Sequence, residues 1–536
     1  DLRAFRPASG GSRRSAAPIR QRDGGRLTVP ALDKPAIVLT TLAYLAVVLA
    51  IGLWAARRTR SSKDFFIAGQ GIGLLVTALA TMSAAMSGFL FIGGPGLTYR
   101  LGMASFFITA PVSFTAGLLS WTVAKRLRLL AEVRQVYTVP DAILCRFRSR
   151  WASGLAATAV VVGTVGYLGA QLQAMGGIIE AIFGTRAMFG EWSLAAAMTA
   201  GLVVVLFYAV AGGMVAGVYT DVFQGALMVG AAVAVFYYAM ASGGGLTSIA
   251  QQIAGSEAFG PEFLDPLGNV PVLTAMGFFF VFAVGNLGQP QTLHKFYMLD
   301  DPRKLKWMPL ILGVSQTLVI LIWLGIGLAI PALVASGTID ALANPDEATP
   351  TFLLSFAPPI LAGMVFAGVL AAIMSTADSF VNIASAALVR DLPRAFGRRV
   401  ERELFWGRIA IVGVAVASAV FAFLYGDLIA LLGTFAFGTF AAALAPAVAV
   451  GLNWKRVTPV AASASIATGL GLNLLLEFLA KQSFLPSLPK PPLQPGVLPS
   501  AFSLAASFTV LFVVTWLTGR PEGDAIDEDV ATVMRI

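Results

Sequence analysis

The sequence predicts an all-α integral membrane protein with about thirteen transmembrane helices, ten of which form two inverted repeats of five. Three observations support this prediction: the composition, the recurrence of long apolar runs, and two broken runs that lie five helices apart. Of the 536 residues, 57% are hydrophobic and only 12% are charged. Soluble domains average about 25% charged residues, so most of this chain is expected to lie in a bilayer.

The apolar runs recur almost from end to end, which favours one membrane domain over residues 34–518. Each run is about 20 residues long and continuous, whereas a membrane β-barrel would show short alternating strands. The domain is flanked by a polar, Arg-rich tail over residues 1–33 and a C-terminal tail over residues 519–536. The predicted helices begin near Lys34, Gly73, Ala104, Ser153, Glu191, Ala216, Val272, Met308, Phe352, Leu404, Leu428, Val457 and Pro499.

The distribution of Lys and Arg predicts the orientation. The loops after the first, third, seventh, ninth and eleventh spans and the C-terminal tail hold 25 of these residues, and the opposite loops hold only Arg100, Arg186, Lys481 and Lys490. Because Lys and Arg concentrate in cytoplasmic loops, we predict a multi-pass inner (plasma) membrane protein with the N-terminus outside and the C-terminus in the cytoplasm. Seven arginines before Lys34 favour the opposite orientation. That tail does not begin with Met, and we interpret it as a processed, mis-started or added segment.

The chain has one cysteine and one histidine, which excludes several classes of site and function. With only Cys145 and His294, the chain offers no disulfide framework and no site built from several imidazoles. A membrane enzyme would need a clustered nucleophile and base, and a channel would need a filter-like repeat. We therefore predict no enzyme, no organic cofactor and no nucleic-acid partner, and we expect His294 to lie in a loop or an interface.

Two spans are interrupted by Gly and Pro. The second span reads TMSAAMSGFLFIGGPG and the seventh reads VFAVGNLGQPQ. Gly and Pro can serve close packing or kinks in membrane helices. Two breaks at corresponding positions of two halves are instead typical of inverted-repeat transporters that bind their substrates near the breaks. The predicted core covers residues 73–451, with spans two to six forming one repeat and spans seven to eleven the other.

A polar cluster lies inside the ninth span. The stretch AAIMSTADSF holds Ser375, Thr376, Asp378 and Ser379. Polar groups at membrane depth face the bundle interior and mark ion or substrate paths. Hydroxyls and free carbonyls suit a hard cation such as sodium. The structural alternative is that Ser and Thr bond back to the carbonyl four residues earlier.

Two acidic residues are candidates for ion coupling. Asp378 could carry a proton, bind sodium or pair with another group, because an unpaired buried carboxylate is costly. Asp221, in GGMVAGVYTDVFQG, lies near the predicted start of the sixth span. For Asp221 we favour a structural role as a hydrogen-bonding group at a helix end.

These motifs resemble those of the sodium/solute symporter family, whose members include bacterial proline, pantothenate and monocarboxylate carriers. The resemblance covers about Ile37 to Leu517. It rests on KDFFIAGQGIG, SGFLFIGGPG, YTVPDAILCRF, GGMVAGVYTDVFQG, GQPQTLHKF and LAAIMSTADS through ALVRDL, in that order. It implies a LeuT-like fold with sodium between the second and ninth spans. The ligands it implies are the carbonyls of Ser83, Met86 and Ala372 and the hydroxyls of Ser375 and Thr376.

The resemblance also implies a substrate site on the second, fourth and seventh spans. By position, its residues are Ser87, Gly88, Phe89, Tyr167, Phe282, Asn286 and Pro290. Proline carriers have Trp and Tyr where this chain has Phe89, Phe282 and Asn286, which argues against proline. Exposed backbone N–H groups near Ser87 and Gly88 would favour an anion, so we expect a monocarboxylate or a small amino acid.

The function that the resemblance implies is sodium-coupled import of a small organic solute across the bilayer. Two alternatives remain. One is a transporter-like membrane sensor, for which the residues after Gly519 are too few to form a signalling domain. The other is a proton-coupled carrier that uses Asp378. No feature of the sequence specifies an oligomeric state.

Overall fold

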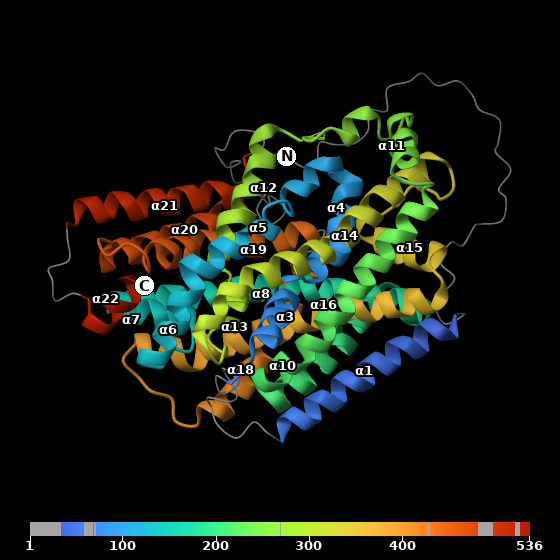
Figure 1. The fold of residues 1–536 in the computed structure, drawn as a ribbon. Coiled ribbons are helices and arrows are strands. Elements are labelled where there is room, and N and C mark those ends of the chain that lie inside the picture. Colours follow the sequence, from blue (N-terminus) through green and yellow to red (C-terminus); the bar gives the residue numbers. More distant parts are fainter. Residues whose placement is uncertain are drawn as a thin grey trace.

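A computed structural model of the protein describes residues 34–57, 68, 71–268, 270–425, 429–480, 497–519 and 526–535. Over these residues the chain is helical apart from turns, loops and one isolated bridge between Ile72 and Leu299, which confirms the predicted fold class (Figure 1). The tail before Lys34, most of the motif that starts at Lys63 and the predicted helix start at Leu428 lie outside the described residues.

The long helices account for most of the predicted spans. Within the described ranges, 11 helices are long and apolar enough to cross a membrane, and the bent pair Leu74–Ala85 and Phe89–Phe107 makes a twelfth span. In chain order the α-helices are α1 (Pro35–Ala56), α3 (Leu74–Ala85), α4 (Gly94–Leu101), α5 (Val112–Leu119), α6 (Lys125–Arg134), α7 (Val139–Phe147), α8 (Arg150–Phe183), α9 (Thr185–Phe189), α10 (Ser193–Ser242), α11 (Leu246–Ala254), α12 (Val272–Gly285), α13 (Pro290–Phe296), α14 (Met308–Ala335), α15 (Ala348–Phe356), α16 (Pro359–Ala386), α17 (Leu392–Ala395), α18 (Glu403–Tyr425), α19 (Ile429–Ala445), α20 (Pro459–Ala480), α21 (Pro499–Leu517) and α22 (Glu528–Arg535).

The third predicted span is a helix of mixed type that begins later than predicted, at Val112. Ala104, its predicted start, lies in the 3-10 turn Gly102–Phe107, at the end of the bent second span. After that turn come α5, a π-helical turn at Ser120–Ala124 and the basic helix α6. These elements follow one another without a gap over residues 112–134, but they are not among the described helices that qualify as apolar membrane spans. The count of thirteen spans therefore stays a prediction.

The ninth span begins at Pro359 and not at Phe352, as the sequence had predicted. Phe352 lies in the short helix α15, which ends before Ala357 in the extended conformation. Two consecutive prolines then start α16. The residue before a proline avoids the helical region, so the apolar run is divided here.

The predicted fifth and sixth spans lie on one continuously assigned helix, α10. Two parts of this region qualify separately as membrane spans, Thr185–Phe207 and Met214–Ser242. The two spans are therefore confirmed, although no loop divides them.

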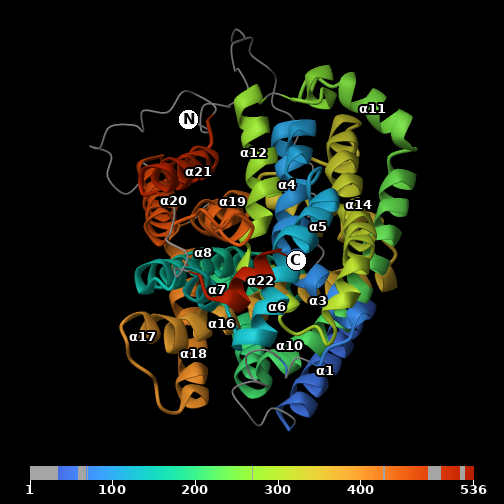
Figure 2. The same cartoon turned by 60° about the vertical axis from the view of Figure 1, so that its left-hand side comes forward.

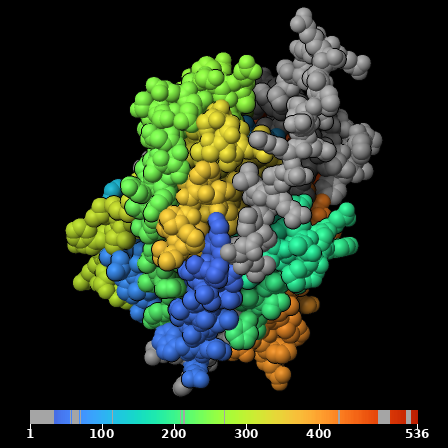
Figure 3. Space-filling model, turned by 90° about the vertical axis from the view of Figure 1, so that its right-hand side faces the viewer, coloured from blue at the N-terminus to red at the C-terminus, as the bar shows by residue number. Residues whose placement is uncertain are grey.

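The helix that carries the polar cluster is at the centre of the bundle. In both α16 and α19, 89% of the apolar window is buried, compared with 28% in α1. Figures 1 and 2 show α8 and α16 in the middle of the molecule. Helix α1 lies on the outside against α10 and α16 (Figure 3). Any polar group in the middle of α16 is therefore enclosed by protein.

A buried ionic network joins α7 to the end of α16. Asp141 pairs with Arg390 at 3.0 Å and with Arg394 at 3.1 Å. The Thr138 hydroxyl donates to Asp391 at 3.0 Å. These contacts connect the loop between the third and fourth spans with the helix that carries the polar cluster.

The C-terminal helix α22 packs beside α6 and α7 (Figure 2). Arg134, at the end of α6, donates to Asp529 at 2.7 Å. Val530, Val533 and Met534 of α22 are buried. Part of the predicted C-terminal tail is therefore a docked helix, held by an apolar face.

A loop contact connects α4 with α19. The 3-10 turn Pro345–Glu347 lies so close to α4 that a Cβ at Gly96 would be 2.7 Å from the Pro345 carbonyl oxygen. The carboxylate of Asp346 accepts from the backbone N–H of Ile429 at 3.1 Å. Burial raises the pKa of Asp346 to about 6.

Candidate functional site

The second span is broken between α3 and the π-helical turn Phe89–Gly93, where the chain bends by 53°. Met86 ends α3 in an extended conformation, with φ −91° and ψ 102°. Ser87 then starts the next helical segment: its hydroxyl accepts from the N–H of Phe89 at 3.2 Å and its carbonyl accepts from the N–H of Leu90 at 2.9 Å. A serine in this position satisfies donors that a helix start leaves free.

The seventh span is broken in a similar way. Gln289 is extended, with φ −77° and ψ 106°, and Pro290 is the first residue of α13. The Gln289 side chain donates to the carbonyls of Gly285 at 3.2 Å and Phe437 at 3.1 Å, which fixes the break against α19. The matching backbone angles at Met86 and Gln289 agree with the predicted inverted repeat.

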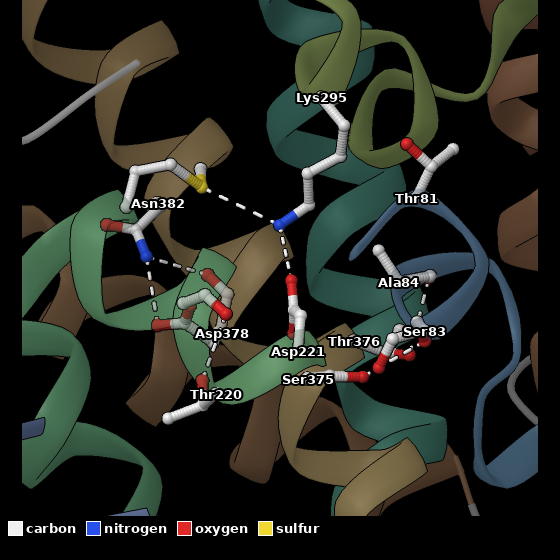
Figure 4. A network of polar contacts seen from close by, with 12 residues as sticks. Thr81, Ser83, Ala84, Thr220, Asp221, Lys295, Ser375, Thr376, Asp378 and Asn382 are labelled. Carbon is white, nitrogen blue, oxygen red and sulfur yellow. Dashed lines mark hydrogen bonds and ion pairs between the residues drawn. The ribbon is translucent and has the colours of Figure 1, made fainter. Parts of the chain in front are cut away.

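Four of the five predicted sodium ligands lie within hydrogen-bond distance of one another. The Ser375 hydroxyl donates to the carbonyls of Ser83 at 3.0 Å and Ala372 at 3.2 Å. The Thr376 hydroxyl contacts the Ala84 carbonyl at 3.4 Å and donates to the Ala372 carbonyl at 2.9 Å. All are buried, and Figure 4 shows Ser83, Ala84, Ser375 and Thr376 side by side. The fifth predicted ligand is the carbonyl of Met86, the residue at which α3 ends.

The chemistry of this group fits a sodium ion. Neutral carbonyl and hydroxyl oxygens from two helices can replace the water ligands of a hard cation. The bonds of Ser375 and Thr376 to Ala372 are the helix-internal bonds expected of a purely structural role. The contacts to Ser83 and Ala84 join two helices, which a purely structural role within α16 does not explain. The Ala84 carbonyl was missed because the sequence does not show which carbonyls face α16.

The predicted substrate residues line the two breaks and the facing side of α8. The hydroxyls of Ser87 and Tyr167 lie 3.1 Å apart. The rings of Phe89 and Phe282 stack at 5.6 Å, and Phe282 stacks on Phe437 at 4.3 Å. The structure therefore brings three spans together at one group of aromatic rings. Phe437, on α19, was missed because the sequence alone does not place α19 beside α12.

Two further predicted substrate residues lie on the seventh span. Asn286 is half-buried in the 3-10 turn after α12 and donates to the Thr115 hydroxyl of α5 at 3.2 Å. Pro290 is buried at the start of α13. Asn286 and Pro290 are thus at the break, but the amide of Asn286 is bonded to α5.

The backbone N–H of Gly88 is not free, contrary to the sequence-based expectation. It donates to Oε1 of Gln171 on α8 at 2.8 Å. A Cβ at Gly88 would lie 2.7 Å from Cγ1 of Ile373, so only glycine fits this approach of α16. Gln171 was missed; the available signal was its position one turn after Tyr167 on the same helix face.

Asp221 is not at a helix end, so that prediction is wrong. It lies within α10, fully buried, and pairs with Lys295 of α13 at 2.7 Å (Figure 4). The Lys295 ammonium also contacts the sulfur of Met214 at 3.7 Å. Lys295 is one of the 25 Lys and Arg residues counted for the predicted cytoplasmic side, whereas it is buried inside the bundle. The carboxylate of this buried ion pair thus comes from the predicted first repeat and the ammonium from the predicted second repeat.

Asp378 lies close to this ion pair on α16 (Figure 4). Asn382 donates to the carbonyl of Asp378 at 2.9 Å and to its Oδ1 at 3.0 Å. Oδ2 has no hydrogen-bond partner and points at Gly217, where a Cβ would be 2.1 Å away. Asp378 is therefore enclosed and bonded by an amide, while Lys295 is bonded to Asp221. Ser379, its neighbour, is also fully buried.

His294 is buried on α13 and contacts the edge of the Tyr297 ring, with the ring centres 5.9 Å apart. The loop position that we expected for it is therefore wrong.

The whole chain was compared with known proteins. The sequence profile described as "Sodium:solute symporter family" matches residues 65–469. The sodium/proline symporter of Escherichia coli is 28% identical, with 82% of this chain and 87% of that protein covered. The sodium/pantothenate symporter of Haemophilus influenzae is 24% identical, with 84% of this chain and 92% of that protein covered.

A solved structure of a Na⁺-coupled sialic acid symporter in its substrate-bound outward-open state has the same fold. The TM-score is 0.73 at 16% sequence identity, and the alignment covers 91% of this chain and 98% of that one. The fold, the two broken helices and the profile match agree with one another. The chain belongs to the sodium:solute symporter family, whose members are membrane transporters and not enzymes.

Proposed function

We propose that the protein is a sodium-coupled symporter that imports a small amino acid across the plasma membrane, with L-proline as the first candidate. The observation that carries this proposal is the set of buried hydroxyl and carbonyl oxygens shared by α3 and α16, directly beside the break in the second span. The curated relatives named above couple sodium to proline or pantothenate. They weigh against the monocarboxylate that the sequence had suggested.

The aromatic rings at the breaks support a compact, partly apolar solute. Phe89, Phe282 and Phe437 form a continuous stack, and Trp323 meets the edge of Phe89 at 5.8 Å. Such faces suit an aliphatic ring or a short side chain. The phenyl groups replace the polar aromatic rings expected for proline carriers, but they keep the apolar surface.

The proposed mechanism follows from the position of the sodium ligands. A sodium ion held by Ser83, Ala372, Ser375 and Thr376 would link α3 to α16 and hold the break in one arrangement. This arrangement also positions Ser87 and Phe89 for the solute. Sodium and solute binding would therefore favour each other by the same factor. The membrane voltage would add about 2.3 kcal/mol per transported charge per 100 mV to uptake.

Uptake into proteoliposomes tests this proposal. Labelled L-proline, other small amino acids and short monocarboxylates are offered with an inward sodium gradient, with potassium in its place, or with a proton gradient alone. We expect sodium-stimulated uptake of proline or another small amino acid. Uptake driven by protons without sodium would support the carrier that uses Asp378, and no uptake of any solute would support the sensor.

A further inference from the structure

Gln171 carries a buried hydrogen-bond donor that no group in the described chain uses. The side chain is fully buried on α8, facing the break in the second span. Its Oε1 accepts from the Gly88 N–H at 2.8 Å, but its Nε2 has no hydrogen-bond partner. Buried polar groups nearly always have partners, so an unused donor beside a binding site indicates a missing acceptor.

The orientation of this carboxamide is determined by its neighbour. The nitrogen and oxygen of a glutamine side chain are assigned from the hydrogen bonds that they make. A backbone N–H can only donate, so Oε1 must face Gly88. The two hydrogens of Nε2 therefore point away from Gly88 and are available to an acceptor.

Other polar groups at the same break already have hydrogen-bond partners. The N–H of Phe89 bonds to the Ser87 hydroxyl, and that hydroxyl lies 3.1 Å from the hydroxyl of Tyr167. The break segments 86–93 and 285–290 contain no Lys or Arg. An anionic group of the solute would have no cation in these segments to pair with. Nε2 of Gln171 is then a buried donor without a partner that the site can offer it.

We propose that Gln171 recognises the carboxylate of the transported solute through its Nε2, while its Oε1 stays bonded to Gly88. This inference rests on the proposed function, because it takes the solute to be a small amino acid. Proline and pantothenate, the solutes named for the relatives, both carry a carboxylate at neutral pH. A carboxylate is the acceptor that makes the strongest bond with an amide donor.

The substitution Gln171→Glu separates recognition from packing. Glutamate has nearly the same shape and keeps an oxygen for the Gly88 N–H, but it replaces the donor with an oxygen that repels a carboxylate. Gln173→Glu is the matched control, because Gln173 lies two residues further along α8 and its Nε2 already donates to the Ala422 carbonyl at 2.8 Å.

The experiment measures the binding of labelled proline to the purified full chain in the presence of sodium. Unlabelled L-proline and L-prolinamide, which lacks the carboxylate, are used as competitors. We expect Gln171→Glu to weaken proline at least about tenfold, the effect of one charged hydrogen bond, while prolinamide is weakened less. Equal weakening of both compounds, or no effect beyond that of Gln173→Glu, would overturn the inference.

Two further measurements keep the outcome clear. If Gln171→Glu fails to fold, Gln171→Met removes the donor without adding charge, and the ratio of proline to prolinamide affinity should still fall. If the unsubstituted protein binds no carboxylated solute in a sodium-dependent manner, the proposed function fails together with this inference. If the protein binds proline but the ratio does not move, only the assignment of Gln171 fails.

Discussion

The buried ion pair between Asp221 and Lys295 provides the sharpest stability prediction. Both side chains are 0% exposed, and their charged atoms are 2.7 Å apart. Oδ1 of Asp221 has no other partner in the described chain. Lys295→Met would keep the length of the side chain and leave the carboxylate of Asp221 without compensation. Removing one partner of such a pair costs about 3–5 kcal/mol of unfolding free energy.

The double variant Asp221→Asn with Lys295→Met removes both charges. It should recover most of that loss, since no isolated charge remains. The free energy of unfolding is measured by denaturant titration in detergent micelles. Lys304→Met is the control, because Lys304 and Asp300 form a pair whose side chains are 43% and 35% exposed, and its loss should cost less than about 1 kcal/mol. If the single and double variants are equally unstable, the loss of stability does not come from an uncompensated buried charge, and the reasoning is refuted.

Three further predictions follow from other parts of the structure. Replacing Ser375 and Thr376 with Ala should raise the sodium concentration for half-maximal uptake about tenfold or more; an unchanged value rejects the sodium assignment. Because burial raises the pKa of Asp346 to about 6, ionising it should cost stability, by at most about 3 kcal/mol, as the pH rises from 4 to 6. Asp346→Asn should remove this loss. An equal fall in the free energy of unfolding between pH 4 and pH 6 in both proteins would contradict it. Val533→Asp should undock α22 and speed proteolysis of the C-terminus, whereas Thr532→Asp, on the exposed face, should not; equal cleavage rates would be inconsistent with docking.

The local pattern of the sequence was enough to predict the membrane fold and the two hydroxyls of the proposed sodium site. Ser375 and Thr376 stand out because they interrupt an apolar run, and the breaks at Met86 and Gln289 are marked by nearby Gly and Pro. These features act through backbone chemistry within a few residues. Local features of this kind can be predicted from a single sequence.

The partners of the buried polar groups could not be predicted in this way. Lys295 and Asp221 are 74 positions apart, and Gln171 and Gly88 are 83 apart. Such pairs are made by helix packing, which leaves no periodic signal in either segment. Lys295 was counted with the loop after the seventh span because it follows the break in that span. Its burial depends entirely on Asp221 being opposite.

The measurement that tests the proposed coupling most directly is the linkage between sodium and solute binding in the purified protein. The affinity for L-proline is determined at a series of sodium concentrations, and the affinity for sodium is determined with and without saturating proline. We predict that each ligand tightens the other by the same factor, well above one, and that the Ser375 and Thr376 double alanine variant shows a reduced factor. A proline affinity that does not change with sodium would contradict the proposed coupling.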